Sequence, residues 1–374
     1  MRWIWEAKNY PNFEYDLENF QNIMQEISIK QGKLIALNDY YDTKSLHKIK
    51  SEILENDAIN TSLIEGKILN RESVRSSIRK KLYLKNQNYQ KNKDESDHLI
   101  DVLIDINTNY DEDLSLEKIF FWHKSLFPNG FSGFEKIKVG EFRGDETMQV
   151  VSGIIGDEKV YYQAPPRDQI DEEMKNFILW FNSYPNNLIK VCIAHLWFVI
   201  IHPFEDGNGR IARLLSDLVL ARIEKSKISR LYSISSAIYN DKKGYYHALE
   251  KTTGYLEKID LLDINYWCAW FLNTLLVSID DTLEKINFIK EKTKFWDKFK
   301  NSNLNSRQIK VLNKILDFGK NNFKGYLNRK KYMSISKTSL ATASRDLADL
   351  VKIGCVKQVE GSKGRNIKYE IILE

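Results

Sequence analysis

The chain has 374 residues, of which 43% are hydrophobic, and 56 Lys and Arg outnumber 51 Asp and Glu to give a net charge of +5. This length allows two or three domains with a sizeable core, and so small a positive excess permits contact with nucleic acid without arguing for it. The three cysteines are far apart in apolar surroundings, which excludes a disulfide framework or a cysteine-based metal site.

Long segments with helical spacing dominate the chain, and 6 prolines and 17 glycines are few for its length. We therefore expect a mainly helical fold. No apolar run reaches the roughly 20 residues of a membrane helix. The first residues lack the apolar core of a signal peptide, so we expect a cytoplasmic protein without membrane contact.

An aromatic segment opens the chain between Trp3 and Tyr15, and the pattern of apolar residues predicts helices over 17–37 and 44–64. The rings are expected to pack locally. Basic residues follow, and then a polar run over 85–97, which we interpret as a solvated face or loop. A second structural region is expected to begin near residue 96.

The helix over 44–64 ends at a threonine, a glutamate and a glycine, namely Thr61, Glu65 and Gly66. Thr61 and Glu65 are one turn apart, so both side chains can face the same neighbour. Gly66 is typical of a helix stop. Because a glutamate near a helix C-terminus is unfavourable against the helix dipole, a cationic partner for Glu65 is favoured over a solvated carboxylate.

Residues 130–166 differ from their helical surroundings because they contain short β-rich runs. The runs 148–153 and 160–164 flank a Gly-Asp turn, which predicts a hairpin, the only clear one in the first 300 residues. Such a hairpin serves either as a structural flap or as an edge for strand addition. Before it, Ser115 predicts the start of a helix over 116–126, in which His123 is expected to be packed or hydrogen-bonded.

The densest group of chemically active residues lies between two apolar helical segments, 188–201 and 211–224. It comprises His202, Asp206, Gly207, Asn208, Gly209, Arg210 and Arg213. The glycines leave bare amides where a helix begins, and a helix N-terminus attracts anions. Arginine forks match phosphate oxygens. A helical corner with a buried histidine would explain each residue singly but not the combination, so the sequence predicts a polyphosphate site.

Further helices are expected over 241–252, 263–276 and 279–299, the first of which carries Tyr245 and Tyr246. Adjacent tyrosines point in different directions, so one could pack in the core while the other stacks on a base. Residues 302–374 read as three helices and a hairpin, which is typical of a winged helix-turn-helix. Ser344 and Arg345 would then face a DNA major groove, with Lys363 and Arg365 on phosphates. Packing or a homodimer contact is the alternative use of this domain.

The string His202 to Arg213, HPFEDGNGRIAR, resembles the signature of Fic-domain proteins, which are nucleotidyltransferases and mostly AMP transferases. The resemblance implies that His202 takes the proton from a target hydroxyl, which then attacks the α-phosphate of ATP. Asp206 would hold Mg²⁺, while the glycine loop with Arg210 and Arg213 would bind the phosphates. This agrees with the chemistry, since a weakly acidic hydroxyl needs a base and a pyrophosphate leaving group needs cations.

The resemblance extends to other segments. The helix end at Glu65 resembles the inhibitory helix of Fic proteins, which implies that Glu65 pairs with Arg213 and blocks placement of the γ-phosphate. In the family a tyrosine pair contacts the nucleotide, which implies this role for Tyr245 and Tyr246, with core filling as the alternative; Thr253 replaces an amide residue of some members. The hairpin resembles the flap that holds the target segment by backbone pairing. The flap residues would be Met148, Gln149, Val150, Val151, Ser152 and Gly153.

The aromatic opening and the flap also resemble a Fic subfamily with an N-terminal extension, so nearly the whole chain is covered. We predict a mainly α protein: an N-terminal helical extension with the inhibitory helix over 1–95, a Fic-type helical core with a β-hairpin flap over 96–300, and a C-terminal winged helix-turn-helix over 301–374.

Two functional hypotheses follow. The first is a protein adenylyltransferase that moves AMP from ATP, with Mg²⁺, to a Ser, Thr or Tyr hydroxyl of a target protein or of itself, restrained by Glu65. The alternative is a DNA-binding winged-helix regulator in which the Fic core senses nucleotide. None of the signature positions is replaced, and this favours the enzyme.

Overall fold

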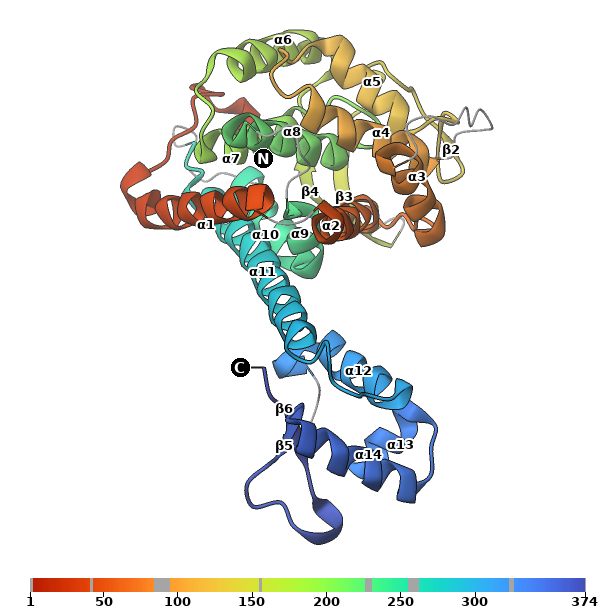
Figure 1. Ribbon diagram of the computed structural model, residues 1–374. Coiled ribbons are helices and arrows are strands. Elements are labelled where there is room, and N and C mark those ends of the chain that lie inside the picture. The colour runs from red at the N-terminus through yellow and green to blue at the C-terminus, as the bar shows by residue number, and fades with distance from the viewer. Residues whose placement is uncertain are drawn as a thin grey trace. The chain divides into compact units, whose positions relative to one another are not determined.

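The computed structural model describes residues 3–40, 43–83, 95–154, 157–225, 231–254, 262–322 and 326–373 (Figure 1). The chain divides into two compact units, Met1–Thr282 and Leu283–Glu374. Helices dominate both units, as predicted. Within the described ranges, no helix combines the length and the apolar character that crossing a membrane requires.

The first unit begins with two short 3-10 helices, η1 (Ile4–Glu6) and η2 (Leu17–Phe20), followed by α1 (Gln21–Tyr40), α2 (Thr43–Ile64) and α3 (Arg71–Tyr83). The opening aromatic residues pack both on one another and on distant parts of the chain: the ring of Tyr10 lies edge-on to that of Phe13, and the ring of Trp3 lies edge-on to that of Tyr162. Gly66 has a φ of 76°, which fits the predicted helix stop. Residues 85–94 of the predicted polar run lie outside the described residues.

The centre of the first unit is a pair of packed helices, α7 (Leu188–Ile201) and α8 (Asn208–Glu224), which lie side by side in Figure 1. Nearly every residue of α7 is buried, as its uninterrupted apolar sequence requires. Three helices surround the pair: α6 (Arg167–Ser183) packs on α7, while α4 (Glu95–Thr108) and α5 (Leu116–Leu126) pack on α8. The oxygen of Ser115 accepts from the amide of Lys118 at the predicted start of α5.

The predicted flap hairpin is present as β3 (Gln149–Ile154) and β4 (Asp157–Gln163), which pair antiparallel. The sequence interpretation was wrong in one respect, because a second hairpin precedes it. This hairpin consists of β1 (Phe131–Ser132) and β2 (Glu135–Lys136). Gly133 at its turn has a φ of 59°. Strands of two residues are too short to show an alternating pattern, which explains why the sequence did not reveal them.

Two further differences concern helices. α9 (Ile234–Asn240) was not predicted; it precedes α10 (Lys242–Thr253), and Asp241 between them caps α10 by accepting from the amide of Gly244. The segments 263–276 and 279–299 form one continuous helix, α11 (Asn265–Lys298), instead of two. Ser278 sits at the expected break, but its hydroxyl donates to the carbonyl of Leu275 and so remains compatible with the helix.

The second unit contains α12 (Ser306–Asn322), α13 (Arg329–Ser336), α14 (Leu340–Ile353), β5 (Val356–Gln358), a 3-10 turn η3 (Gly364–Asn366) and β6 (Tyr369–Ile371). The strands β5 and β6 pair antiparallel, and Leu327 adds a β-bridge to Tyr369 on the other edge of β6. The elements thus occur in the predicted order of three helices and a hairpin. Cys355 lies in the core of this unit, and all three cysteines are buried and free, as expected.

Candidate active site

The loop between α7 and α8 owes its shape to two residues in the left-handed region. His202 ends α7 with a φ of 50°, and Gly207 precedes α8 with a φ of 89°. A non-glycine residue with positive φ is uncommon and points to a local constraint. The loop therefore turns sharply after His202 and presents the amino end of α8 to the same region as the histidine ring.

The side chain of Asn208 holds the loop together. Its oxygen accepts from the amide of Phe204 at 3.0 Å, and its nitrogen donates to the carbonyl of Phe204 at 2.7 Å. The asparagine is buried. Both amide functions are thus used by the loop itself, so the predicted contribution of Asn208 to phosphate binding is restricted to its backbone amide at the start of α8.

The imidazole of His202 is oriented by α7. Its Nδ1 lies 3.1 Å from the carbonyl oxygen of Val199, which can only accept, so Nδ1 carries the hydrogen. Burial lowers the pKa of His202 to about 4, against a smaller opposing effect of that hydrogen bond. The ring is therefore neutral near pH 7, and its Nε2 is left as a base.

The carboxylate of Asp206 is held from several sides. One oxygen accepts from the hydroxyl of Ser132 in β1, the other accepts from the amide of Gly207, and Nη2 of Arg210 lies 3.8 Å away. Among the described residues there is no cluster of three or more His, Cys, Asp or Glu that could hold a metal ion. A single oriented carboxylate fits Mg²⁺, because this ion is usually bound by one or two carboxylates together with substrate phosphates and waters.

Arg210 and Arg213 lie in the first two turns of α8 and are 3% and 2% exposed. The guanidinium of Arg210 lies over the ring of Phe127, at 4.5 Å from the ring centre. Nε of Arg210 and Nη1 of Arg213 are buried without a hydrogen-bond partner. Because a buried donor without an acceptor is costly, these two atoms indicate a site for an anion.

Glu65 reaches the same place from the end of α2. Its Oε1 lies 2.7 Å from Nη2 of Arg213, which is the contact expected from the sequence. Arg213 also donates to the hydroxyl and to the carbonyl of Thr61, at 2.8 and 2.9 Å. A Cβ added to Gly209 would come within 2.4 Å of Glu65 Oε1, so only glycine leaves room there. The carboxylate therefore lies against the amino end of α8, where an anion is most favoured.

The two tyrosines of α10 have different environments. Tyr245 is 2% exposed, and its hydroxyl lies 3.0 Å from Nε2 of the buried His195, so its ring belongs to the core. Tyr246 is 41% exposed, and its hydroxyl donates to the carbonyl of Ile64, next to Glu65. Tyr245 thus fills the core, which is the alternative that the sequence allowed, and its contact with a nucleotide stays a prediction. Tyr246 remains a candidate.

The flap is anchored at its base. The hydroxyl of Tyr162 in β4 donates to the carbonyl of Ile200 at 2.6 Å, and Nε1 of Trp5 donates to the carbonyl of Gln163 at 2.7 Å. The pairing of β3 with β4 shifts between Val150 and Val151, which marks a bulge. The six predicted flap residues, 148–153, thus comprise most of β3 and the residue before it.

Arg143 was not recognised from the sequence as part of the site. Its amide and its Nε donate to the carbonyls of Pro203 and His202, and Nη2 donates to the carbonyl of Pro165 beyond the flap. It is 2% exposed. All its partners are backbone carbonyls distant in sequence, so no side-chain motif could have revealed the contact.

His123 of α5 is a structural residue, as expected. The amide of Gly140 donates to its Nδ1 at 3.0 Å, so Nε2 carries the hydrogen and donates to the carbonyl of Asp206. Its ring stacks on that of Phe204 with 4.0 Å between the centres. It thus ties the loop before the flap to the loop between α7 and α8.

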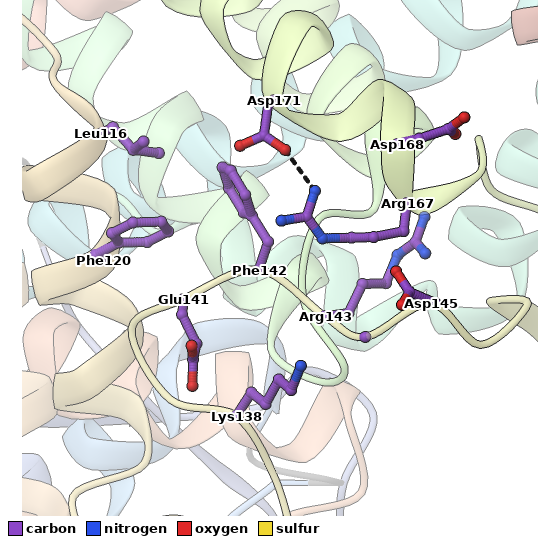
Figure 2. A pocket seen from close by; sticks show the side chains of 11 residues that line it. Leu116, Phe120, Lys138, Glu141, Phe142, Arg143, Asp145, Arg167, Asp168 and Asp171 are labelled. Atoms are coloured by element: carbon purple, nitrogen blue, oxygen red, sulfur yellow. Dashed lines mark hydrogen bonds and ion pairs between the residues drawn. The ribbon is translucent and has the colours of Figure 1, made fainter.

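Arg143 also lines a cavity of about 630 Å³ (Figure 2). Figure 2 shows the rings of Phe120 and Phe142 and the ion pair between Arg167 and Asp171. Three basic side chains in the lining face four acidic ones. These are Lys138, Arg143, Arg167, Glu141, Asp145, Asp168 and Asp171. The net negative lining disfavours a polyphosphate, so the anion site remains the amino end of α8.

Two family models match the chain. The model described as the Fic/DOC family matches residues 113–220, which contain the loop between α7 and α8, the flap and Arg143. A model described as a domain of unknown function, DUF4172, matches residues 3–84, which contain Thr61 and Glu65.

Curated relatives include the protein adenylyltransferase fic-1 of Caenorhabditis elegans, which is 29% identical over 115 residues, or 30% of this chain and 20% of that protein. The protein adenylyltransferase Fic of Drosophila mojavensis is 25% identical over 206 residues, or 53% of this chain and 38% of that protein. The chain thus spans less than two fifths of the length of these relatives.

Among solved structures, a Fic family protein from Desulfovibrio desulfuricans G20 matches with a TM-score of 0.54 at 17% identity. The match covers 97% of this chain and 98% of that one. At this identity the match establishes a shared fold and nothing further.

Proposed function

We propose that the chain is a Fic-type enzyme, since residues 113–220 match the Fic/DOC family, that it transfers AMP from ATP to a hydroxyl of a target protein, and that Glu65 restrains this activity. The observation that carries the proposal is the arrangement at the amino end of α8. A neutral histidine, an oriented carboxylate and two buried arginines surround one anion site, and an internal carboxylate is bound to one of the arginines there.

In this reaction Nε2 of His202 takes the proton of the target hydroxyl. The hydroxyl oxygen forms a bond to the α-phosphorus of ATP, the bond from that phosphorus to the bridging oxygen breaks, and pyrophosphate leaves with the electron pair. Arg210 and Arg213 stabilise the charge on the phosphates, together with the amides at the start of α8. Asp206 would hold Mg²⁺, which supplies further charge neutralisation.

The restraint follows from competition for Arg213. Nη2 of Arg213 is bound to Glu65, while Nη1 lacks an acceptor. A terminal phosphate that reached both nitrogens would have to displace the carboxylate, because two anions cannot share one guanidinium edge at this distance. Thr61 would keep Arg213 in place after Glu65 has left, since it accepts from Nε as well as from Nη2.

The target is expected to bind along the flap. In the described chain β3 has β4 as its only strand partner, so its other edge can pair with an extended segment of a target. Residues 148–153 would then position a Ser, Thr or Tyr hydroxyl toward His202. The modified residue can lie on another protein or on this chain.

The second candidate is a regulator in which the Fic core senses nucleotide and the second unit binds DNA. The order of elements in residues 283–374 supports it. It differs from the first candidate in one measurable respect, because it requires nucleotide binding but no transfer.

The test is incorporation of label from α-labelled ATP with Mg²⁺ into the protein itself and into proteins of a cell lysate. We expect little label with the natural sequence, at least about tenfold more with Glu65→Gly, and a loss of about 10²–10⁴-fold in Glu65→Gly/His202→Ala. Glu72→Gly serves as the matched control, since it removes an exposed glutamate of α3 that does not contact Arg213. Absence of label from all forms, with ATP or any other nucleotide, would contradict the proposal.

A further inference from the structure

The charge of the chain is distributed unequally between its two units. Residues 283–374 contain 21 Lys and Arg against 9 Asp and Glu, a net charge of +12. Residues 1–282 contain 35 against 42, a net charge of −7. A basic unit of this size attracts polyanions, and the overall charge of +5 conceals it.

The three helices of the second unit are fixed to one another by a buried carboxylate. Asp346 of α14 accepts from Nε and Nη2 of Arg307 in α12, and it accepts from the hydroxyl of Tyr332 in α13. The same face of α14 buries Ala343, Leu347 and Leu350. One face of α14 therefore packs in the core of this unit. This packing fixes which residues of α14 point outward.

The opposite face of α14 carries small residues together with Arg345 and Asp349. Ala341, Arg345, Ala348 and Asp349 are exposed and Ser344 is half-buried, and Lys352 continues the face toward the end of the helix. A purely solvated helix face would be expected to carry long charged side chains. A row of small side chains instead lets a helix approach another surface closely, with Arg345 as the one long donor near its start.

Leu340 at the start of α14 is also exposed. It is 55% exposed because it is the first residue of α14, ahead of the buried face. An apolar side chain at this point could contact a thymine methyl group.

The hairpin after α14 carries further positive charge. Lys363 and Lys368 are exposed between β5 and β6, where Gly361 and Gly364 adopt positive φ. The bridge between Leu327 and Tyr369 attaches the hairpin to the segment before α13. The turn and α14 are thus held in one compact unit, as a helix in a groove and a turn on the adjacent phosphates would require.

We propose that residues 283–374 bind duplex DNA, with the outer face of α14 in the major groove and the turn between β5 and β6 on the phosphate backbone. Arg345 would contact base edges, for which guanine offers two acceptors to an arginine fork. Lys363 would contact phosphates and so contribute affinity without sequence preference. This binding is separate from AMP transfer and does not depend on it.

The test begins with selection of duplexes from a random-sequence DNA pool by the full chain. Fluorescence anisotropy then gives its affinity for a selected duplex and for a scrambled one between 50 and 200 mM salt. We expect Arg345→Ala to weaken binding to the selected duplex by about 10- to 100-fold and to reduce its preference over the scrambled one. Lys363→Ala should weaken both alike and lower the salt slope by about one.

Lys294→Ala is the charge-matched control. It removes the same charge from an exposed position on α11, outside the proposed surface, and should change either affinity by less than about twofold. Circular dichroism of each variant establishes that the fold is retained. Equal losses from Arg345→Ala and Lys294→Ala, absence of duplex binding, or tighter binding of single-stranded RNA than of any duplex would overturn the proposal.

Discussion

Arg213 and Arg345 illustrate how differently the two units use positive charge. Arg213 in the first unit is 2% exposed and bound to Glu65 and Thr61, and Arg210, three residues before it on α8, is 3% exposed. Arg345 in the second unit is exposed on the outer face of α14, and exposed lysines occupy the hairpin after it. The first unit encloses a few cations around one anion site, while the second displays many on its surface.

The net charge of a unit alone predicts neither the buried anion site of the first unit nor the exposed basic surface of the second. The first unit has a net charge of −7 and yet contains the candidate polyphosphate site, because the buried guanidiniums of Arg210 and Arg213 act locally in a medium where water screens little. The second unit has a net charge of +12 in a surface arrangement that salt would screen. We therefore expect nucleotide binding to depend weakly on salt and DNA binding to depend on it strongly.

Asp346 is a buried carboxylate within the basic second unit, so replacing it should destabilise that unit alone. Asp346→Ala would leave Arg307 and Tyr332 without their acceptor. We expect it to lower the free energy of unfolding of the second unit by about 2–4 kcal/mol. Hydrogen exchange of the amides in α12–α14, compared with those in α7, measures this. Equal loss of protection in α7 would show that the two units do not unfold separately.

The buried His123 should make the stability of the first unit depend on pH. Burial lowers its pKa from the ordinary value of 6.5 to about 4. Because the folded state disfavours the charged form, its contribution to stability is fully present above about pH 6.5 and is lost as the pH falls toward 4.

His123→Phe keeps the stacking on Phe204 but removes this titration. The loss of unfolding free energy between pH 7 and pH 5 should be smaller in the variant by about 2 kcal/mol. Urea unfolding at the two pH values gives the difference. An unchanged pH dependence would mean that His123 is not responsible for it.

Replacing Ser132 should have the smallest effect of these changes, and it tests how Asp206 is held at the anion site. Its hydroxyl donates to Asp206, so it should position the carboxylate without touching the reacting atoms. In a Glu65→Gly background, Ser132→Ala is expected to raise the Mg²⁺ concentration needed for half-maximal transfer by about tenfold, with a smaller change in kcat. Ser183→Ala on α6 is the control, since that hydroxyl bonds only within its own helix. A fall in kcat without a change in the Mg²⁺ requirement would contradict a positioning role.

Much of the site could be predicted from sequence because its main residues are adjacent. His202, Asp206, Arg210 and Arg213 lie within twelve residues, and the structure places them around one loop. The helix end by itself predicted only a cationic partner for Glu65; the resemblance implied that this partner is Arg213, 148 positions away, and the structure has the contact. Of the two adjacent tyrosines, Tyr245 packs in the core, and its contact with a nucleotide stays a prediction.

The contacts that sequence could not reveal share one physical feature. Arg143, His123 and Asn208 all use backbone groups as partners, and a backbone carbonyl or amide looks the same in every sequence. Most of the helices and the longer hairpin were predicted from periodicity. α3, α4, α9 and the two-residue strands were not predicted; the shortest of these elements lack a period. α11 was divided in two, although the hydroxyl of Ser278 is compatible with an uninterrupted helix.

The central claim is that Glu65 occupies the position of a terminal phosphate at the amino end of α8. Calorimetry in a His202→Ala background, which prevents turnover, can compare the affinities for ATP and AMP with Mg²⁺ before and after Glu65→Gly. We predict that removing Glu65 raises the affinity for ATP by about tenfold or more and changes that for AMP by less than about twofold. An equal gain for both nucleotides, or none for ATP, would contradict the claim.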